Sequence, residues 1–357
     1  MNPHRLPSRL LLILSACLLP LGAQTPLFTD GPAFGGSKVF SEGRNPQGNS
    51  ARIDQAAPGW YMTYVDGSVR ALDNKSILSD CLAPDAAAVA AALARLDKAP
   101  WALKTKGYGL AGIKDGASFA YTREEFNGVL ASADLDPTRL GANLGLNGTT
   151  FMGRRVTVDR LSFGGGGSQN GTSFGGNLRM ERWTRGSRTG ALNPGGDQIP
   201  LASVENGLYT FTETQDKTLS YSMDLGYCIE VAQGLRLGVT VDQLNPKHLW
   251  DVYLRPQFRA GLQFDLGATT KLSVESDINA VERMPFPVKQ QTSSASLRFS
   301  TSPEVAFLLG AERRKIGDAT VTRGGITLQL RTAAVLIGIG IQIGQDSPLK
   351  GATLMVN

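Results

Sequence analysis

Apolar and polar residues alternate strictly from Thr218 to Val231. Leucine, tyrosine, methionine, isoleucine and valine fill one set of alternate positions, and threonine, serine, aspartate, glycine, cysteine and glutamate fill the other. A period of two is that of a β-strand with one apolar and one polar face. The run exceeds the usual strand length of about 5–6 residues and suits the roughly 9–11 residues that cross an outer membrane. It therefore predicts a membrane-spanning strand whose apolar face contacts lipid.

The same alternation recurs through the second half of the chain, and it predicts an all-β protein. We expect a transmembrane antiparallel β-barrel of about 12–14 strands, with a small helical or irregular N-terminal plug. Apart from Thr218–Val231, the expected strands are Leu140–Leu146, Arg154–Phe163, Phe174–Arg185, Leu235–Asp242, Arg255–Asp265, Thr270–Ala280, Ser293–Ser300, Glu304–Lys315, Ile326–Arg331, Ala334–Gly344 and Leu349–Asn357.

The connections between these strands alternate in length. Every second one is short, as at Ala232-Gln233 and Thr301–Pro303, and Gly164–Thr172 is the longest of this set. The others are longer or more variable, up to Gly186–Lys217. Outer-membrane barrels have short periplasmic turns and longer extracellular loops. A secreted β-sandwich, the alternative fold, has no reason to sort its loops in this way, and we expect Gly186–Lys217 to face the outside.

Residues 1–23 have the features of a secretory signal. Positive charge precedes an apolar core that ends in small residues, which predicts cleavage before Gln24. Lipoprotein-type cleavage at Cys17 is the alternative. Export predicts the outer membrane of a Gram-negative-type bacterium as the location. The mature chain divides into an N-terminal plug or periplasmic segment, 24–139, and the barrel, 140–357.

Local signals within the N-terminal segment predict two hairpins and two short helices. Asp66 and Asp115 each precede a glycine, and Asp-Gly suits the positive backbone angles of a type I′ turn. Alanine-rich Pro84–Lys98 predicts a helix. A second helix is expected from Thr122, because its spacing to Glu125 matches a capping box.

Charge points to the lumen rather than to a nucleic acid. Removing the signal lowers the formal net charge from +5 to +3, and lysine and arginine are scattered rather than clustered with aromatic residues. Both signs occur on the polar faces of neighbouring expected strands. They predict an ion-pair network inside the barrel or, alternatively, the lining of a selective pore. These residues are Asp224, Glu230, Arg236, Asp242, Arg259, Asp265, Glu275, Asp277, Arg298, Glu312, Arg314 and Arg331.

The mature chain offers little catalytic or metal-binding chemistry. His248 is its one histidine, and it lies in an expected external loop. An outer-membrane hydrolase would need His248 beside a serine such as Ser220 or Ser222. A loop histidine explains the residue more simply, and we expect no enzyme activity, no cofactor and no metal site.

Cys81 and Cys228 remain after removal of the signal, in a compartment that permits disulfides. Cys228 lies on the polar face of its strand near the expected periplasmic end. Cys81 lies in the segment that would fold into the barrel mouth. A disulfide between them is one expectation, and two unpaired cysteines are the other.

Three segments carry a family resemblance: LRPQFRAGLQFDLG (254–267), KLSVESDIN (271–279) and AFLLGAERR (306–314). With the glycine-punctuated last pair of strands, they resemble the TraF-like outer-membrane proteins of conjugal transfer. Those proteins look like relatives of the FadL-type long-chain fatty-acid transporter barrels. The chain departs from such families at 45–47, where Asn-Pro-Gln stands in place of their common Asn-Pro-Ala.

The resemblance implies a non-enzymatic envelope component of the TraF-like kind or, alternatively, a FadL-like channel for hydrophobic solutes. An apolar cavity in the lumen would favour transport, and a lumen filled by ion pairs would favour a structural role. Expected partners are outer-membrane lipid, other envelope or secretion components, and the barrel-assembly machinery, but not nucleic acid. That machinery would recognise the last strand, where Gly351, Leu354 and Val356 keep the spacing of an assembly signal.

Overall fold

The computed structural model describes residues 37–40, 49–51, 58–69, 100–132, 150–191, 216–332, 335–344 and 349–356. Its regular elements there are β1 (Gly59–Val69), β2 (Pro100–Lys114), β3 (Ala117–Ser132), β4 (Thr150–Gln169), β5 (Thr172–Ala191), β6 (Asp216–Ala232), β7 (Leu235–Asp242), β8 (Lys247–Leu249), β9 (Val252–Leu254), β10 (Gln257–Asp265), β11 (Thr270–Asp277), β12 (Val281–Arg283), β13 (Val288–Ser300), β14 (Val305–Ile316), β15 (Ala319–Arg331), β16 (Val335–Gly344) and β17 (Leu349–Val356). Within these residues, no helix is long and apolar enough to cross a membrane.

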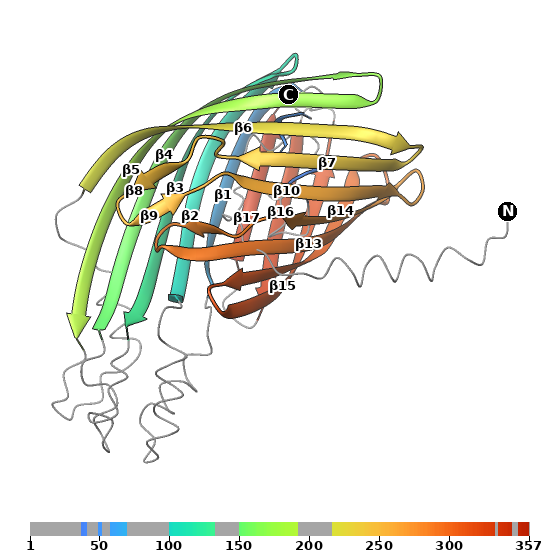
Figure 1. Ribbon diagram of the computed structural model, residues 1–357. Coiled ribbons are helices and arrows are strands. Elements are labelled where there is room, and N and C mark those ends of the chain that lie inside the picture. Colours follow the sequence, from blue (N-terminus) through green and yellow to red (C-terminus); the bar gives the residue numbers. More distant parts are fainter. Residues whose placement is uncertain are drawn as a thin grey trace.

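An antiparallel sheet of 15 strands closes on itself. The first strand, β1, pairs with the last, β17, and β11 pairs with β13. Among the described strands β12 pairs with β13 alone, so the other 14 form the barrel wall. Figure 1 shows these strands side by side around the barrel, with the small β8–β9 hairpin near β3 to β5. The predicted fold class, an antiparallel barrel of about 12–14 strands, is confirmed.

The wall has apolar side chains outside and polar ones inside. On β6, Leu219 and Tyr221 are 78% and 67% exposed, whereas Ser222 is 0% and Asp224 is 7% exposed. The burial pattern alternates along most of the strand, as its sequence predicts. In an outer-membrane barrel the exposed apolar face contacts lipid.

The two ends of the barrel differ in the connections they carry. Five of the turns at one end join β2–β3, β4–β5, β6–β7, β10–β11 and β13–β14, and they span two to four residues between strands. Two of them are type I′ in form, since Asp115 and Gly116 have φ of 49° and 76°, and Asn170 and Gly171 have 51° and 74°. The opposite end joins β7 to β10 and β11 to β13 through longer segments that contain β8, β9 and β12. We call these the short-turn end and the long-loop end.

Several local expectations are wrong. Thr122 and Glu125 do not open a helix, because both lie within β3, which pairs with β2 and β4 along its length. Asp66 makes no hairpin turn, because β1 continues through it between β2 and β17. The glycine-rich 164–167 segment belongs to β4 rather than to a turn. Turn and cap signals are local, and pairing on both sides of a strand outweighs them.

The barrel also begins earlier in the chain than the pattern indicates. The pattern predicts a plug or periplasmic segment at 24–139, but β1, β2 and β3 are wall strands. An inserted segment does exist, and its described parts are 37–40 and 49–51, which lie inside the barrel. We call them the N-terminal segment. The expected helix Pro84–Lys98, the strand Leu140–Leu146 and Cys81 lie outside the described residues.

Candidate functional site in the barrel lumen

Three neighbouring strands bring predicted charges together inside the lumen. Arg259 on β10 donates from Nε to Asp277 at 2.7 Å and from Nη1 to Glu275 at 3.0 Å, both on β11. Asp242 on β7 forms an ion pair with Lys38 of the N-terminal segment. Arg259 is only 2% exposed, so these charges compensate one another in place of water.

Two further predicted groups pair elsewhere on the inner face. Asp224 on β6 accepts from Nη2 of Arg179 on β5 at 2.8 Å. Arg314 donates to Glu312 at 2.7 Å along the same strand, β14. The structure therefore does not gather all the predicted charges into one chain of contacts, but distributes them around the wall.

The last two predicted carboxylates, Glu230 and Asp265, lie near the short-turn end. Arg236 approaches Asp265 at 3.1 Å and Glu230 at 3.8 Å. All three side chains are partly exposed, so water and salt weaken this group relative to the buried pairs.

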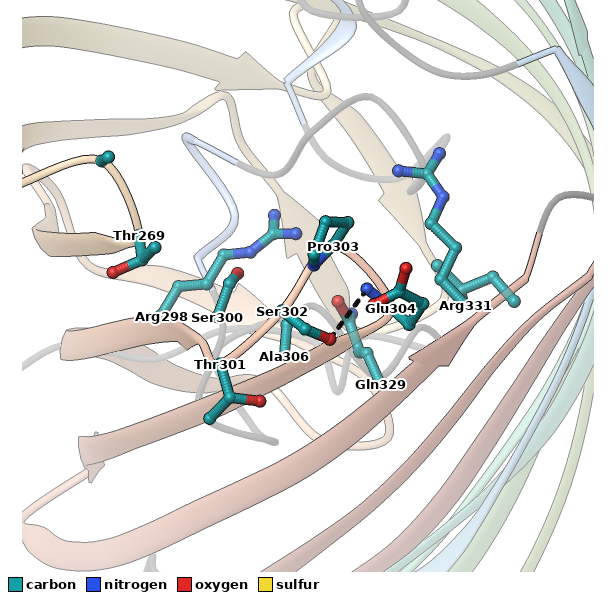
Figure 2. Close-up of a pocket in the computed structure, with 12 residues that line it drawn as sticks. Thr269, Arg298, Ser300, Thr301, Ser302, Pro303, Glu304, Ala306, Gln329 and Arg331 are labelled. Carbon is teal, nitrogen blue, oxygen red and sulfur yellow. Dashed lines mark hydrogen bonds between the residues drawn. The ribbon is translucent and has the colours of Figure 1, made fainter.

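A pocket of about 390 Å³ lies at the short-turn end, between the β10–β11 turn and strands β13 to β16. Arg298 and Arg331 help to line it, and Figure 2 shows them on either side of Pro303. The backbone N–H of Glu304 donates to Ser302 Oγ at 3.2 Å. A hydrogen bond from the Ser302 side chain to the Glu304 carboxyl lowers the pKa of that carboxyl. The pocket is thus polar, with charges of both signs at its rim.

A second buried ion-pair group contains none of the predicted residues. Arg160 on β4, 1% exposed, donates to Glu124 on β3 at 2.6 Å and to Glu181 on β5 at 2.9 Å. Lys247, on β8, reaches the second oxygen of Glu181 at 2.5 Å. Glu124 was hidden by its assignment to a helix. Arg160 and Glu181 stand on expected strands whose alternation is irregular, although Arg179 and Glu181, two positions apart on β5, were a usable signal.

The N-terminal segment is held by a carboxylate of the wall. Glu275 accepts hydrogen bonds from Ser37 Oγ at 2.8 Å, from the backbone N–H of Lys38 at 3.0 Å and from that of Val39 at 2.8 Å. Hydrogen bonds to a charged group are stronger than neutral ones. Glu275 therefore connects the segment to the Arg259 group.

Glycines of five wall strands make room for this segment. A Cβ at Gly166 or Gly175 would come within 2.3 or 2.4 Å of the carbonyl oxygen of Ser50, which is too close for any atom pair. At Gly226, Gly238 and Gly261 a Cβ would instead meet the side chains of Asn49, Val39 and Phe40. We call these residues the glycine track: Gly166, Gly175, Gly226, Gly238 and Gly261. Only glycine lets backbone approach a strand so closely.

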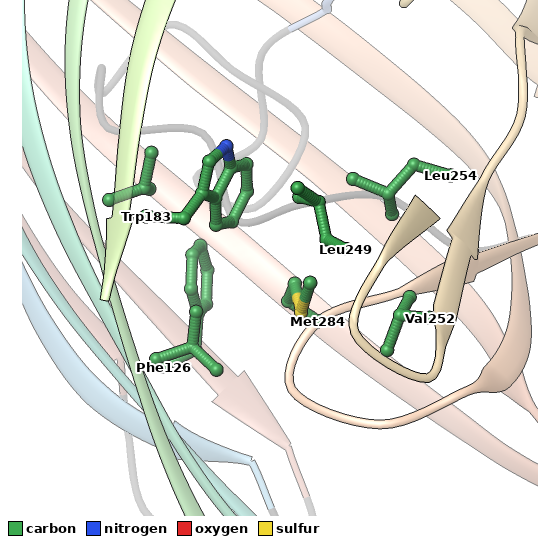
Figure 3. Packing of buried hydrophobic residues seen from close by; sticks show 8 residues of the cluster. Phe126, Trp183, Leu249, Val252, Leu254 and Met284 are labelled. Carbon is green, nitrogen blue, oxygen red and sulfur yellow. The ribbon is translucent and has the colours of Figure 1, made fainter. Parts of the chain in front are cut away.

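An apolar cluster lies inside the lumen toward the long-loop end. The β8–β9 hairpin folds against the inner wall, so that Leu249 faces Trp183 and Phe126, and Val252 lies on the far side of Met284 (Figure 3). The full set is Phe126, Val156, Val158, Trp183, Leu249, Val252, Leu254 and Met284. Its members are at most 6% exposed, and burial of this kind stabilises by about 25 cal/mol per Å² of apolar surface.

Polar contacts orient the hairpin over this cluster. Asp251 at its tip accepts from Arg154 Nη1 at 3.0 Å and from Arg185 Nη1 at 3.3 Å. The Arg185 guanidinium also lies 4.7 Å from the ring centre of Trp250, a cation–π contact. The hairpin thus has an apolar underside and a charged attachment to β4 and β5.

The candidate catalytic residues and the described cysteine take ordinary positions. His248 stacks on Tyr253 with ring centres 4.2 Å apart. Ser220 and Ser222, considered as nucleophiles, contact Lys247 Nζ at 3.0 and 2.6 Å. Cys228 is buried and packs with Val39 and Phe40 of the N-terminal segment. Its disulfide with Cys81 stays a prediction, because Cys81 lies outside the described residues.

No protein-family model and no curated protein matches the chain. Solved structures do. The chain is similar to the CymD monoaromatic hydrocarbon channel, with a TM-score of 0.56 at 9% identity over 95% of this chain and 98% of that one. The fold is that of an outer-membrane β-barrel. The TodX deltaS2S3 mutant monoaromatic hydrocarbon channel gives a TM-score of 0.53 at 9% identity, covering 93% and 99%. The Ralstonia pickettii toluene transporter TbuX gives 0.50 at 9%, covering 94% and 95%.

These likenesses establish the fold and leave the cargo of this chain open. The FadL-like part of the sequence resemblance fits them, whereas nothing supports the TraF-like part. The outer-membrane location also agrees with them. The signal and its cleavage site stay predictions.

Proposed function

We propose that this protein is an outer-membrane channel for small hydrophobic solutes. The observation that carries the proposal is the apolar cluster inside the lumen, beneath a hairpin at the long-loop end. A pore for ions or sugars gains nothing from such a surface, whereas an apolar solute moves favourably from water into it. The channels and transporter of monoaromatic hydrocarbons that share the fold support this cargo class.

In this proposal the cluster is a closed entry site. Val252 and Leu254 of the hairpin are 0% and 1% exposed, and Trp183 of the wall is 1% exposed. A solute enters when the hairpin lifts, and its apolar surface then replaces that of the hairpin against Trp183 and Phe126. The free energy of the exchange is close to zero, because apolar surface is buried both before and after it and such contacts are non-directional.

Solute uptake by cells tests the proposal. A strain lacking the gene should take up a radiolabelled monoaromatic hydrocarbon more slowly, and the wild-type gene should restore the rate. Val252→Asp, which buries a charge in the cluster, should not restore it, whereas Leu266→Asp, in a turn at the other end and 51% exposed, should. Surface levels and heat-modifiable mobility of both variants provide the folding control.

The buried ion pairs favour a second candidate, a barrel with a structural role in the envelope. Arg160 and Arg259 fill lumen space that an open channel would leave free. The same strains separate the two candidates. If deletion leaves hydrocarbon uptake unchanged but makes the envelope leak a periplasmic enzyme, the structural role is correct and the channel proposal is wrong.

A further inference from the structure

The outer face of the wall carries a charged group where lipid contact is expected. Arg123 on β3, Asp159 on β4 and Arg182 on β5 stand opposite one another in register. Asp159 accepts from Arg123 at 3.3 Å, from Arg182 at 2.9 Å and from the Tyr121 hydroxyl at 2.9 Å. Residues adjacent in sequence, such as Arg160, are buried on the inner face, so this group points outward.

More cations surround this group on the same face. Arg155 on β4 pairs with Glu125 on β3 at 2.5 Å, and Lys106 on β2 stands opposite Glu125. Lys217 extends the row onto β6 and is exposed. Five cations against two carboxylates leave a local charge of +3, which becomes +2 when Asp66 on β1, opposite Lys106, is counted. We call the set the outer charged cluster: Lys106, Arg123, Glu125, Arg155, Asp159, Arg182 and Lys217.

Apolar side chains lie beside this cluster on the side of the short turns. Leu161 and Phe163 follow Asp159 at alternate positions on the outer face of β4. Phe163 packs against Phe119 of β3 with ring centres 5.3 Å apart. Met180 and Leu178 of β5 are each 50% exposed. The outward surface is therefore amphipathic along the membrane normal, with its charges toward the long-loop end, which faces the outer leaflet in outer-membrane barrels.

The other side of the wall differs. The outward residues of β7 and β10 are apolar up to their long-loop ends, including Val239, Val241, Phe258 and Ala260. Outward cations recur at the long-loop ends of β14 and β17, as Arg313, Lys315 and Lys350. The charges of β2 to β6 differ from these in being joined by hydrogen bonds around Asp159.

We propose that the outer charged cluster binds the phosphate group of a phosphorylated glycolipid in the outer leaflet, whose acyl chains lie over Phe119, Phe163 and Met180. Each guanidinium has five N–H donors. Arg123 uses one on Asp159 and Arg182 uses two. Asp159 is then the positioning residue that fixes both side chains while further donors face outward.

Exposure agrees with this assignment. The side chains of Arg123 and Arg182 are 42% and 61% exposed, whereas that of Asp159 is 12% exposed. An anionic headgroup therefore reaches the cations without disturbing the carboxylate. Arginine forms paired hydrogen bonds to phosphate. The proposal depends on the barrel's orientation in the outer membrane and not on any solute that the lumen carries.

Lipid binding to the purified full-length barrel tests the site. Diphosphoryl lipid A is added to the protein in detergent, and bound lipid is measured by native mass spectrometry. The triple variant Arg123→Gln, Asp159→Asn, Arg182→Gln leaves no carboxylate stranded, and it should bind about tenfold more weakly, since cations next to anionic headgroups supply much of such affinity. Lys289→Gln, at an exposed lysine on β13 across the barrel from β4, should bind as the wild type does.

Three results would overturn the site. They are equal binding by the triple variant, equal binding of chemically dephosphorylated lipid A, and full displacement by millimolar inorganic phosphate. The last would mean that the apolar rows hold no chains. If the triple variant lacks the heat-modifiable band of a folded barrel, Arg182→Gln alone replaces it, because that side chain is 61% exposed. It should still lower binding measurably, and no change would count against the proposal.

Discussion

The lumen is closed in two places, and the two closures use opposite chemistry. Toward the long-loop end, the β8–β9 hairpin covers an apolar cluster by contact of buried side chains such as Leu249 and Trp183. Toward the short-turn end, the N-terminal segment is held by directional hydrogen bonds to Glu275 and by close backbone contact with the glycine track. Apolar contact is non-directional, so a solute can replace it piece by piece. The polar closure lacks that freedom, because each buried donor needs its own acceptor.

This difference separates the two steps of passage. We call the β8–β9 hairpin over the apolar cluster the upper closure and the N-terminal segment the lower closure. An apolar solute can open the upper closure by its own binding energy, because it offers the same kind of surface as the hairpin. It cannot replace the hydrogen bonds of Glu275. Opening of the lower closure therefore requires movement of the N-terminal segment or a route around it, and the two closures should respond to different substitutions.

The largest effect is expected at Arg160, whose partner Glu181 also pairs with Lys247 of the hairpin. Arg160→Met leaves Glu124 and Glu181 without their shared cation in a buried site, and breaking such a buried group costs roughly 3–5 kcal/mol of unfolding free energy. Urea unfolding in lipid vesicles, followed by tryptophan fluorescence, measures this loss. The matched variant is Arg182→Met, whose side chain is 61% exposed, and it should cost less than about 1 kcal/mol. Equal losses would mean that enclosure in the lumen adds nothing to the pairs.

The sequence predicted the wall better than its contents, for a physical reason. Strand β6 is exposed to lipid on one face and polar on the other, so its composition alternates at every position. Strand β3 has charges on both faces, with Glu124 inside and Arg123 and Glu125 outside. Its alternation is therefore invisible to a pattern based on hydrophobicity, and the capping-box spacing wrongly predicts a helix.

The candidate site shows the same limit. Individual inward charges such as Asp242 and Glu275 could be named from alternation within their own strands. Their partnership with Lys38 and Ser37 could not, because those residues are more than 200 positions away and their segment has no period. The glycine track was equally hidden, since Gly166 and Gly238 carry no side chain that would mark the inner face.

The upper closure should be weakened by Leu249→Ala. Leu249 is 3% exposed within the apolar cluster, and truncation of a buried leucine costs roughly 2–5 kcal/mol. The hairpin would pack less tightly on Trp183, so hydrocarbon uptake should rise while the unfolding midpoint falls. Leu266→Ala, in an exposed turn at the other end, should change neither. A stability loss without faster uptake would separate the cluster from the entry route.

The lower closure should be disturbed by Gly166→Val. The new Cβ would stand 2.3 Å from the Ser50 carbonyl oxygen, so either the wall or the N-terminal segment must shift, at a cost of roughly 1–3 kcal/mol. We expect the segment to leave, which a cysteine-reactive probe should detect as increased labelling of Cys228. Gly167→Val is the matched control, because nothing lies within 4 Å of its Cβ position. Unchanged labelling in both variants would mean that the segment is not seated on the track.

The smallest effect is expected at His248, which lies on the hairpin but outside both closures. His248→Ala removes the stacking contact with Tyr253, 4.2 Å between ring centres, and a ring pair of this kind contributes about 0.5–1.5 kcal/mol. The exposed position of His248 places it at the low end of that range, and hydrocarbon uptake should stay at the wild-type rate. The variant also tests the hydrolase alternative, since His248 is the only histidine that a mature chain could use as a general base. If the wild-type barrel hydrolyses a chromogenic ester and His248→Ala does not, the purely passive channel is refuted. A histidine that only stacks on Tyr253 would not be needed for hydrolysis.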